Sequence, residues 1–119
     1  MQATRIFANL SVPDIGDARD FYVDYLGLTI EGLNLGWVAR SRSPDGEAAV
    51  QLVTRDATAP LNSVMSVAVG DGIEEAYEET KRRGFEIVYP LTKEPWGIRR
   101  FFVRAPDGNV ININSHHDE

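Results

Sequence analysis

The stretch 12-VPDIGDARDFYVDYLGLTI-30 returns later in the chain as 69-VGDGIEEAYEETKRRGFEI-87. A shift of about 57 positions aligns the two copies, and self-similarity at a fixed spacing marks an internal repeat. Each copy follows a strand-like segment, opens on an acidic residue, carries apolar residues at helical spacing and stops at a glycine. The chain is therefore predicted to be one strand–helix–strands unit built twice.

The ends of the two helices carry recognisable signals. Asp14 and Asp71 are expected to cap the helix starts, because an aspartate side chain can accept a hydrogen bond from the first free backbone N–H groups. Gly27 and Gly84 are expected to end them, because glycine adopts the left-handed conformation found after a helix. The predicted buried stripes are Ile15, Ala18, Tyr22, Tyr25 and Leu26 in the first helix, and Ile73, Ala76, Tyr77 and Thr80 in the second.

A second repeated motif supports the repeat. It is 43-SPDG-46 in the first half and 105-APDG-108 in the second, and both are turn-forming tetrads. Alternating or apolar segments predict strands over 5–12, 28–33, 35–42, 47–54, 63–69, 85–91, 97–104 and 109–114. We expect a single domain of two modules, about 1–56 and 63–119, joined by a linker at 57–62.

Composition bounds the function. The chain has 119 residues, a formal net charge of −6 and no cysteine, which excludes disulfides and thiolate chemistry. No apolar run reaches the roughly 18 residues that span a bilayer, and the start of the chain has no signal-peptide pattern. We therefore expect a cytoplasmic protein that binds neither nucleic acid nor membrane. The acidic balance fits either a cationic small ligand or simple solubility.

Several motifs of this sequence resemble those of a known family. The Val-Pro-Asp helix start, the 25-YLGL-28 helix end and above all 95-PWGIRRFFVRAPDGN-109 are similar to the vicinal oxygen chelate superfamily of glyoxalases, bleomycin-resistance proteins and dioxygenases. The resemblance covers nearly the whole chain. It implies an α+β fold of two βαβββ modules whose curved mixed sheets form an open cup, and it implies a homodimer.

Enzymes of that superfamily hold a divalent metal through His and Glu side chains on four strands. Carried onto this sequence, those positions fall on Phe7, Val64, Asn112 and Gln51, the last within one residue. Phe and Val cannot ligate a metal, and the amides of Asn and Gln offer only weak neutral oxygens. We therefore expect a member of the superfamily with no metal, no other cofactor and no catalytic residue.

The histidines do not restore a metal site. His116 and His117 are adjacent near the end of the chain, and adjacent residues of an extended segment point in opposite directions. Both are predicted to lie in a solvated tail over 115–119.

Strand alternation predicts which side chains face the cup. One face of the paired strands is aliphatic and suits helix packing: Ile6, Ala8, Leu10 and Val12, Val50 and Leu52, Val67 and Val69, and Ile111 and Ile113. The other face mixes apolar residues with amides and hydroxyls: Phe7, Asn9 and Ser11, Ala49, Gln51 and Val53, Val64, Ser66 and Ala68, and Val110, Asn112 and Asn114. Apolar walls with a few hydrogen-bonding groups are typical of small-molecule pockets, and these faces offer no carboxylate or imidazole as a base.

Two tryptophans lie near the predicted rims. Trp96 can stack on a planar ligand or support its loop, whereas Trp37 favours packing at a dimer contact. Of Arg99 and Arg100, at most one can point inward, and a solvated surface role is the preferred reading for each.

The leading hypothesis is a non-catalytic dimer that sequesters an aromatic or cationic antibiotic-like molecule and so confers drug resistance. Its predicted ligand-binding residues are Phe7, Asn9, Trp37, Gln51, Val64, Ser66, Trp96 and Asn112. One alternative is a lyase, isomerase or dioxygenase-type enzyme with an atypical site. Another is a structural or regulatory dimer whose cup is vestigial.

Overall fold

The computed structural model describes residues 1–116, and all their side chains except those of residues 31–34. The chain divides into two compact units: a first unit, Phe7–Asn62, and a second unit made of Met1–Ile6 and the chain from Ser63 onward. Within the described residues, no helix has the length and apolarity needed to cross a membrane.

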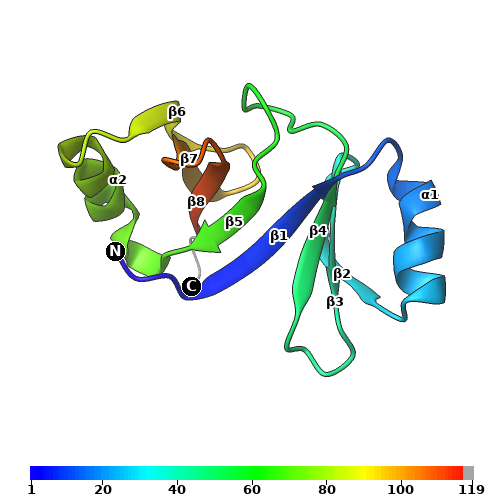
Figure 1. Cartoon of the computed structure of the whole chain (residues 1–119). Helices are drawn as coiled ribbons and strands as arrows, with labels where there is room; N and C mark the ends of the chain where they lie inside the picture. Colours follow the sequence, from blue (N-terminus) through cyan, green and yellow to red (C-terminus); the bar gives the residue numbers. More distant parts are fainter. Residues whose placement is uncertain (117–119) are drawn as a thin grey trace. The chain divides into compact units, whose positions relative to one another are not determined.

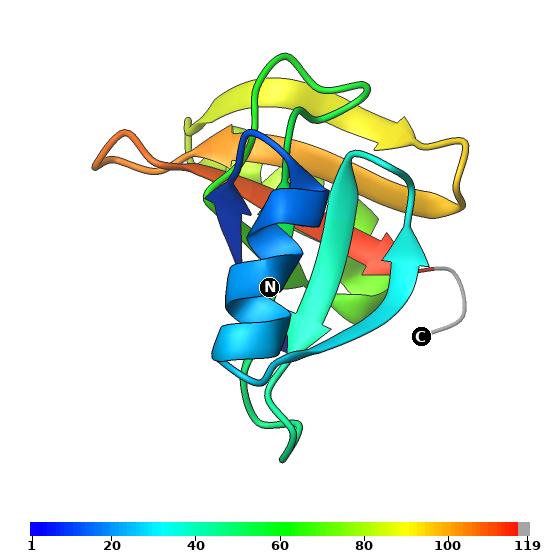
Figure 2. The same cartoon turned by 90° about the vertical axis from the view of Figure 1, so that its right-hand side faces the viewer.

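The first unit has the predicted strand–helix–strands order. Its elements are β1 (Arg5–Ser11, whose first two residues belong to the second unit), α1 (Ile15–Arg19), η1 (Asp20–Tyr25), β2 (Thr29–Asn34), β3 (Val38–Arg42) and β4 (Ala49–Val53). The strands are ordered β2-β3-β4-β1, with β1 parallel to β4 and the other pairs antiparallel. The helical segment lies beside the strands in both views of this unit and contacts β4 (Figures 1 and 2).

The second unit repeats this architecture. Its elements are β5 (Met65–Ala68), η2 (Gly70–Gly72), α2 (Ile73–Arg82), β6 (Glu86–Lys93), β7 (Ile98–Arg104) and β8 (Val110–His116). The order is β5-β8-β7-β6, again with one parallel pair, β5 with β8. The predicted α+β fold of two βαβββ modules is confirmed.

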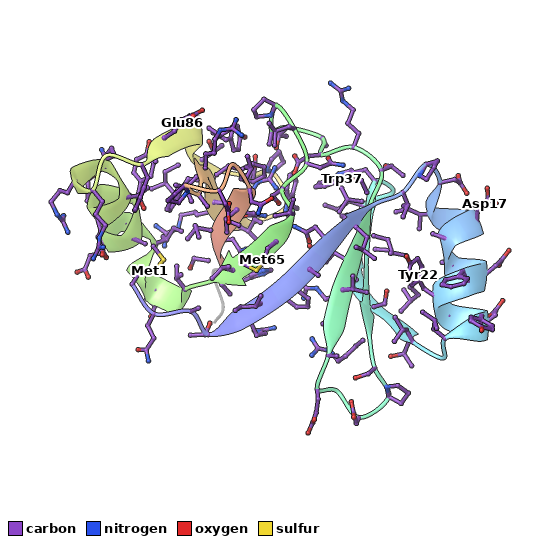
Figure 3. The ribbon with its side chains drawn as sticks, viewed as in Figure 1. Met1, Asp17, Tyr22, Trp37, Met65 and Glu86 are labelled. Carbon is purple, nitrogen blue, oxygen red and sulfur yellow. The ribbon has the colours of Figure 1, made fainter. Side chains whose placement is uncertain are left out.

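The core of the second unit confirms the predicted alternation. Helix α2 packs against the sheet through Ile73 and Ala76, which join Val67, Phe101 and Ile113 in one buried cluster. Met65, labelled on β5 in Figure 3, is partly buried against the same cluster. Apolar residues spaced by two on the strands and by three on the helix meet because both periods place them on facing surfaces. The residues between them on each strand therefore form a helix-free face.

The helix of the first unit departs from the prediction. Asp14 caps α1 as expected, accepting a hydrogen bond from the backbone N–H of Asp17 at 2.8 Å. From Asp20 the helix widens into a π-helix, in which the N–H of Leu26 reaches back five residues to Phe21. The predicted buried stripe is not buried: Ile15, Ala18 and Tyr22 are half-buried, and Tyr25 and Leu26 are exposed.

Two further expectations were wrong. Asp71 does not cap α2: it lies in the short η2 turn, and Gly72 occupies the cap position without a side-chain hydrogen bond. Residues 115 and 116 do not form a solvated tail, because Ser115 is buried and His116 pairs with Ile98 as the last residue of β8. The prediction for His117 falls outside the described residues.

Candidate functional site

The helix-free face of the second unit is built from alternate residues of three strands. Ser66 on β5 lies opposite Asn112 on β8, which lies opposite Phe102 on β7. One step along the strands, Ala68, Asn114 and Arg100 make a second row. All six residues are buried, so two amides, a hydroxyl and a guanidinium are held out of water beside Phe102 and Ala68.

Asn112 has an incompletely satisfied amide. Its Nδ2 donates to Ser66 Oγ at 3.3 Å, while its Oδ1 has no hydrogen-bond partner among the described residues. The residue is only 7% exposed. A buried acceptor without a donor costs about 1–3 kcal/mol, so a fold that keeps one has a polar group ready for a donor from outside the chain.

Beside this row, Arg100 and Glu94 form a buried ion pair. Arg100 Nε lies 2.5 Å from Glu94 Oε2, and the two side chains are 3% and 2% exposed. Tyr89 donates its hydroxyl to the same carboxylate, at 3.2 Å from Oε2 and 3.3 Å from Oε1. The charges therefore compensate each other inside the unit.

Three aromatic rings surround the Arg100 guanidinium. Its Cζ lies 5.0 Å from the ring centroid of Phe102, 5.2 Å from that of Trp96 and 5.6 Å from that of Tyr89. All three distances fall within the range of cation–π attraction. We call these three rings together with Glu94 the arginine cage.

The cage overturns one expectation and adds a group that the strand faces did not predict. Arg100 is buried rather than solvated, and Glu94, from the turn between β6 and β7, brings a carboxylate beside this face. Arg99, in contrast, points to the helix side and pairs with Glu74. The signal was present in the sequence: Arg100 and Phe102 alternate with Arg99 and Phe101, and a four-residue turn returns Glu94 to the start of β7.

The first unit has a corresponding helix-free face, also with arginines. Phe7 is buried, with the guanidinium of Arg40 4.4 Å from its ring centroid and that of Arg42 5.8 Å away. Asn9 lies opposite Gln51, which lies opposite Arg40. Sequence reasoning found Phe7, Asn9 and Gln51 but missed both arginines, although they alternate with Ser41 on β3.

The remaining predicted site residues lie at strand ends. Trp37, labelled in Figure 3, is half-buried just before β3, where its carbonyl accepts hydrogen bonds from Thr54. Val64 precedes β5 and is 46% exposed. Trp96 is half-buried in the turn between β6 and β7. The predicted residues thus fall into two groups, Phe7, Asn9, Trp37 and Gln51 in the first unit, and Val64, Ser66, Trp96 and Asn112 in the second.

The residues at the superfamily's metal positions do not fit a metal. Phe7 has no donor atom and lies beside Arg40, a cation that would repel another cation, and Asn112 offers only the neutral oxygen of an amide. Among residues 1–30 and 35–116, whose side chains the structure describes, no three His, Cys, Asp or Glu side chains come together in a metal-binding group. The structure therefore offers these positions no donor set of the kind that transition metals require.

Known proteins share this fold. The family model described as Glyoxalase/Bleomycin resistance protein/Dioxygenase superfamily matches residues 5–113. No curated protein matches the sequence.

Several solved structures are similar. A glyoxalase/bleomycin resistance protein/dioxygenase superfamily member from Vibrio splendidus 12B01 has a TM-score of 0.69 and 19% identity, over 93% of this chain and 97% of that one. Methylmalonyl-CoA epimerase from Mycobacterium tuberculosis has a TM-score of 0.72 and 18% identity, over 96% and 89%. A protein from Legionella pneumophila described as an NAD-dependent benzaldehyde dehydrogenase has a TM-score of 0.76 and 16% identity, over 94% and 99%. Likeness at these identities shows the fold alone.

Proposed function

The chain belongs to the glyoxalase/bleomycin resistance protein/dioxygenase superfamily, and we propose that it is a metal-independent protein that captures a planar small molecule. The ligand lies on the helix-free face of the second unit, against Trp96, Ser66 and Asn112. A protein that binds an antibiotic without modifying it protects the cell by removing one molecule of the compound for each binding site. The role that we propose is the sequestration of an antibiotic-like aromatic compound in the cytoplasm.

One observation carries this proposal: the unsatisfied Oδ1 of Asn112, buried next to an aromatic cluster. A ligand that donates one hydrogen bond there and stacks on the indole of Trp96 would satisfy the amide and cover apolar area at the same time. The absence of a metal-binding group among the described residues supports binding over the metal-assisted chemistry of the superfamily's enzymes.

The test is a titration of aromatic antibiotics followed by tryptophan fluorescence, with Trp37→Phe as the background so that Trp96 reports alone. Because Trp96→Ala removes the fluorescent reporter, its affinity is measured by calorimetry. Trp96→Ala should weaken binding by one to two decades, and Asn112→Ala should weaken it by about fivefold. Elemental analysis of untagged protein should find well under one equivalent of metal. If both variants bind the ligand with unchanged affinity, the ligand does not contact Trp96 or Asn112 and the proposed site is wrong.

A second candidate function rests on Glu94. A buried carboxylate held by Arg100 and Tyr89 resembles the proton-transfer groups of lyases and isomerases. Such an enzyme would exchange a ligand C–H proton with solvent, and Glu94→Gln would abolish that exchange. Ligand that binds in D2O without incorporating deuterium favours capture over catalysis.

A further inference from the structure

We propose that Arg100 determines the charge class of the ligand: it fills an aromatic cage that would otherwise bind cations, so the helix-free face of the second unit takes uncharged planar molecules. This inference rests on the proposed function, and it narrows the expectation of an aromatic or cationic ligand to the uncharged class.

The cage has the composition of a cation receptor. Tyr89, Trp96 and Phe102 present ring surfaces to a single cation within 6 Å, and Glu94 supplies the negative charge at 2.5 Å. Aromatic walls with one carboxylate are the chemistry by which proteins hold quaternary ammonium groups. Here the guest is the chain's own guanidinium, tethered through β7 and therefore present at a high effective concentration.

Charge balance argues against any second ion at this place. Arg100 and Glu94 are nearly inaccessible to water and already pair with each other, so a further cation would meet the charge of Arg100, a further anion would meet that of Glu94, and either would lose its hydration. A neutral ring avoids that cost. Asn112 Oδ1 can accept a hydrogen bond from an N–H or O–H group, and an uncharged carboxamide, phenol or lactam provides such a donor.

Three probes of one shape separate the charge classes: naphthalene-2-carboxamide, 2-naphthoate and 2-naphthyltrimethylammonium. Calorimetric titration of the wild-type protein should give the carboxamide at least tenfold tighter binding than either ion. Asn112→Ala should weaken the carboxamide about fivefold and leave the weak ammonium binding unchanged, since only the carboxamide offers a donor to Oδ1.

Arg100→Met tests the cage directly, because methionine keeps much of the side-chain volume and removes the internal cation. With Glu94 in place, the ammonium probe should gain at least tenfold in affinity and become the preferred ligand. The matched control is Arg99→Met, which removes the neighbouring positive charge on the opposite face of the same strand and should leave all three affinities within twofold.

The double variant Arg100→Met/Glu94→Gln guards against a failure to fold, because it removes both charges of the buried pair together. The double variant retains the three rings, so it should bind the ammonium probe at least about threefold more tightly than the wild type does. Equal ammonium affinity in wild type and in every foldable Arg100 variant would overturn the inference.

The outcomes also separate this inference from the proposed function. If no probe binds the wild type but the ammonium probe binds Arg100→Met, the capture role fails and the cage remains. If the ammonium probe is the tightest ligand of the wild type, the capture role stands and the assignment of Arg100 is wrong.

Discussion

Arg42 and Arg104 make the same hydrogen bond in the two units. Each donates Nη1 to the carbonyl of the glycine four residues on, Gly46 at 3.2 Å and Gly108 at 3.1 Å. The intervening aspartate also acts alike in both, accepting from the backbone N–H two residues later. The repeat visible in the sequence as Arg-x-Pro-Asp-Gly is therefore also a repeat of hydrogen bonds in the two hairpin turns.

The turn glycine is needed for its backbone conformation. Gly108 has φ 93°, and no atom lies within 4 Å of the position that a Cβ would take, so Gly108→Ala should lose stability through backbone strain alone, about 1–2 kcal/mol. Gly72→Ala is the matched control: Gly72 has φ −86° and equally open space, and the change should be neutral within about 0.5 kcal/mol. Urea unfolding of both variants provides the comparison, and equal losses would mean that strain at residue 108 is not the cause.

Neighbouring residues on β8 should behave in opposite ways. Ile113 is buried in the core under α2, so Ile113→Ala should destabilise the protein by about 2–5 kcal/mol. Asn112 lies on the helix-free face with an unsatisfied acceptor, so Asn112→Ala should cost little and lower ligand affinity instead. Thermal melts and titrations of the two variants test the alternation. If Ile113→Ala leaves the melting temperature unchanged and Asn112→Ala lowers it strongly, the assignment of the two faces of β8 is inverted.

The Arg100–Glu94 pair should show strong coupling. Glu94→Gln alone removes one charge of a buried ion pair and should cost about 3–5 kcal/mol of unfolding free energy. Arg100→Met/Glu94→Gln should recover most of that loss, because neither charge remains. The exposed Arg83–Glu79 pair at 2.9 Å is the control, and its double-mutant cycle should give less than about 0.5 kcal/mol. Additive losses at residues 94 and 100 would contradict a direct interaction.

Asp45 should titrate below its ordinary range. The hydroxyl of Ser43 donates to Asp45 Oδ1 at 2.5 Å and, with the backbone N–H of Glu47, holds the pKa of that carboxyl below its usual value of 3.8. A lowered folded-state pKa means that Asp45 adds stability above pH 3.8, and this contribution disappears as pH falls through the folded-state pKa. Ser43→Ala should raise the pKa of Asp45 toward 3.8, as read from its carboxyl resonance in an NMR pH titration. An unmoved resonance would assign the shift to the backbone donor.

The protein should be a homodimer. Phe21, Tyr25 and Leu26 on the first unit's helix are exposed, and Leu10 on the helix side of β1 is 37% exposed although Leu52 beside it in the sheet is fully buried. A cluster of exposed large apolar residues is a common mark of an interface. Light scattering should give twice the chain mass, and Tyr25→Lys with Leu26→Lys should shift the protein to monomer. A monomeric wild type at micromolar concentration would contradict this.

The sequence by itself determined the repeated architecture. Periods of two and of three to four residues, punctuated by glycines that return as Gly27 and Gly84 with positive φ, define strands and helices locally and need no knowledge of the third dimension. The same alternation correctly placed Ser66 and Asn112 together on the helix-free face, because partners on paired strands share a face. The sequence also puts Phe7, Gln51, Val64 and Asn112 at the superfamily's metal positions, and the ability to ligate a metal is a property of residue type.

Tertiary structure alone decided which polar groups are buried and with whom. Glu94 and Arg100 look like surface residues in the sequence, but the turn between β6 and β7 brings one onto the other, and both side chains are buried beside three aromatic rings. The exposure of Tyr25, at a position where the helical periodicity predicts burial, is likewise seen only in the folded chain. Burial of a charge is favourable only when the counter-charge arrives in the right place, and that depends on contacts between strands rather than on the residues taken one by one.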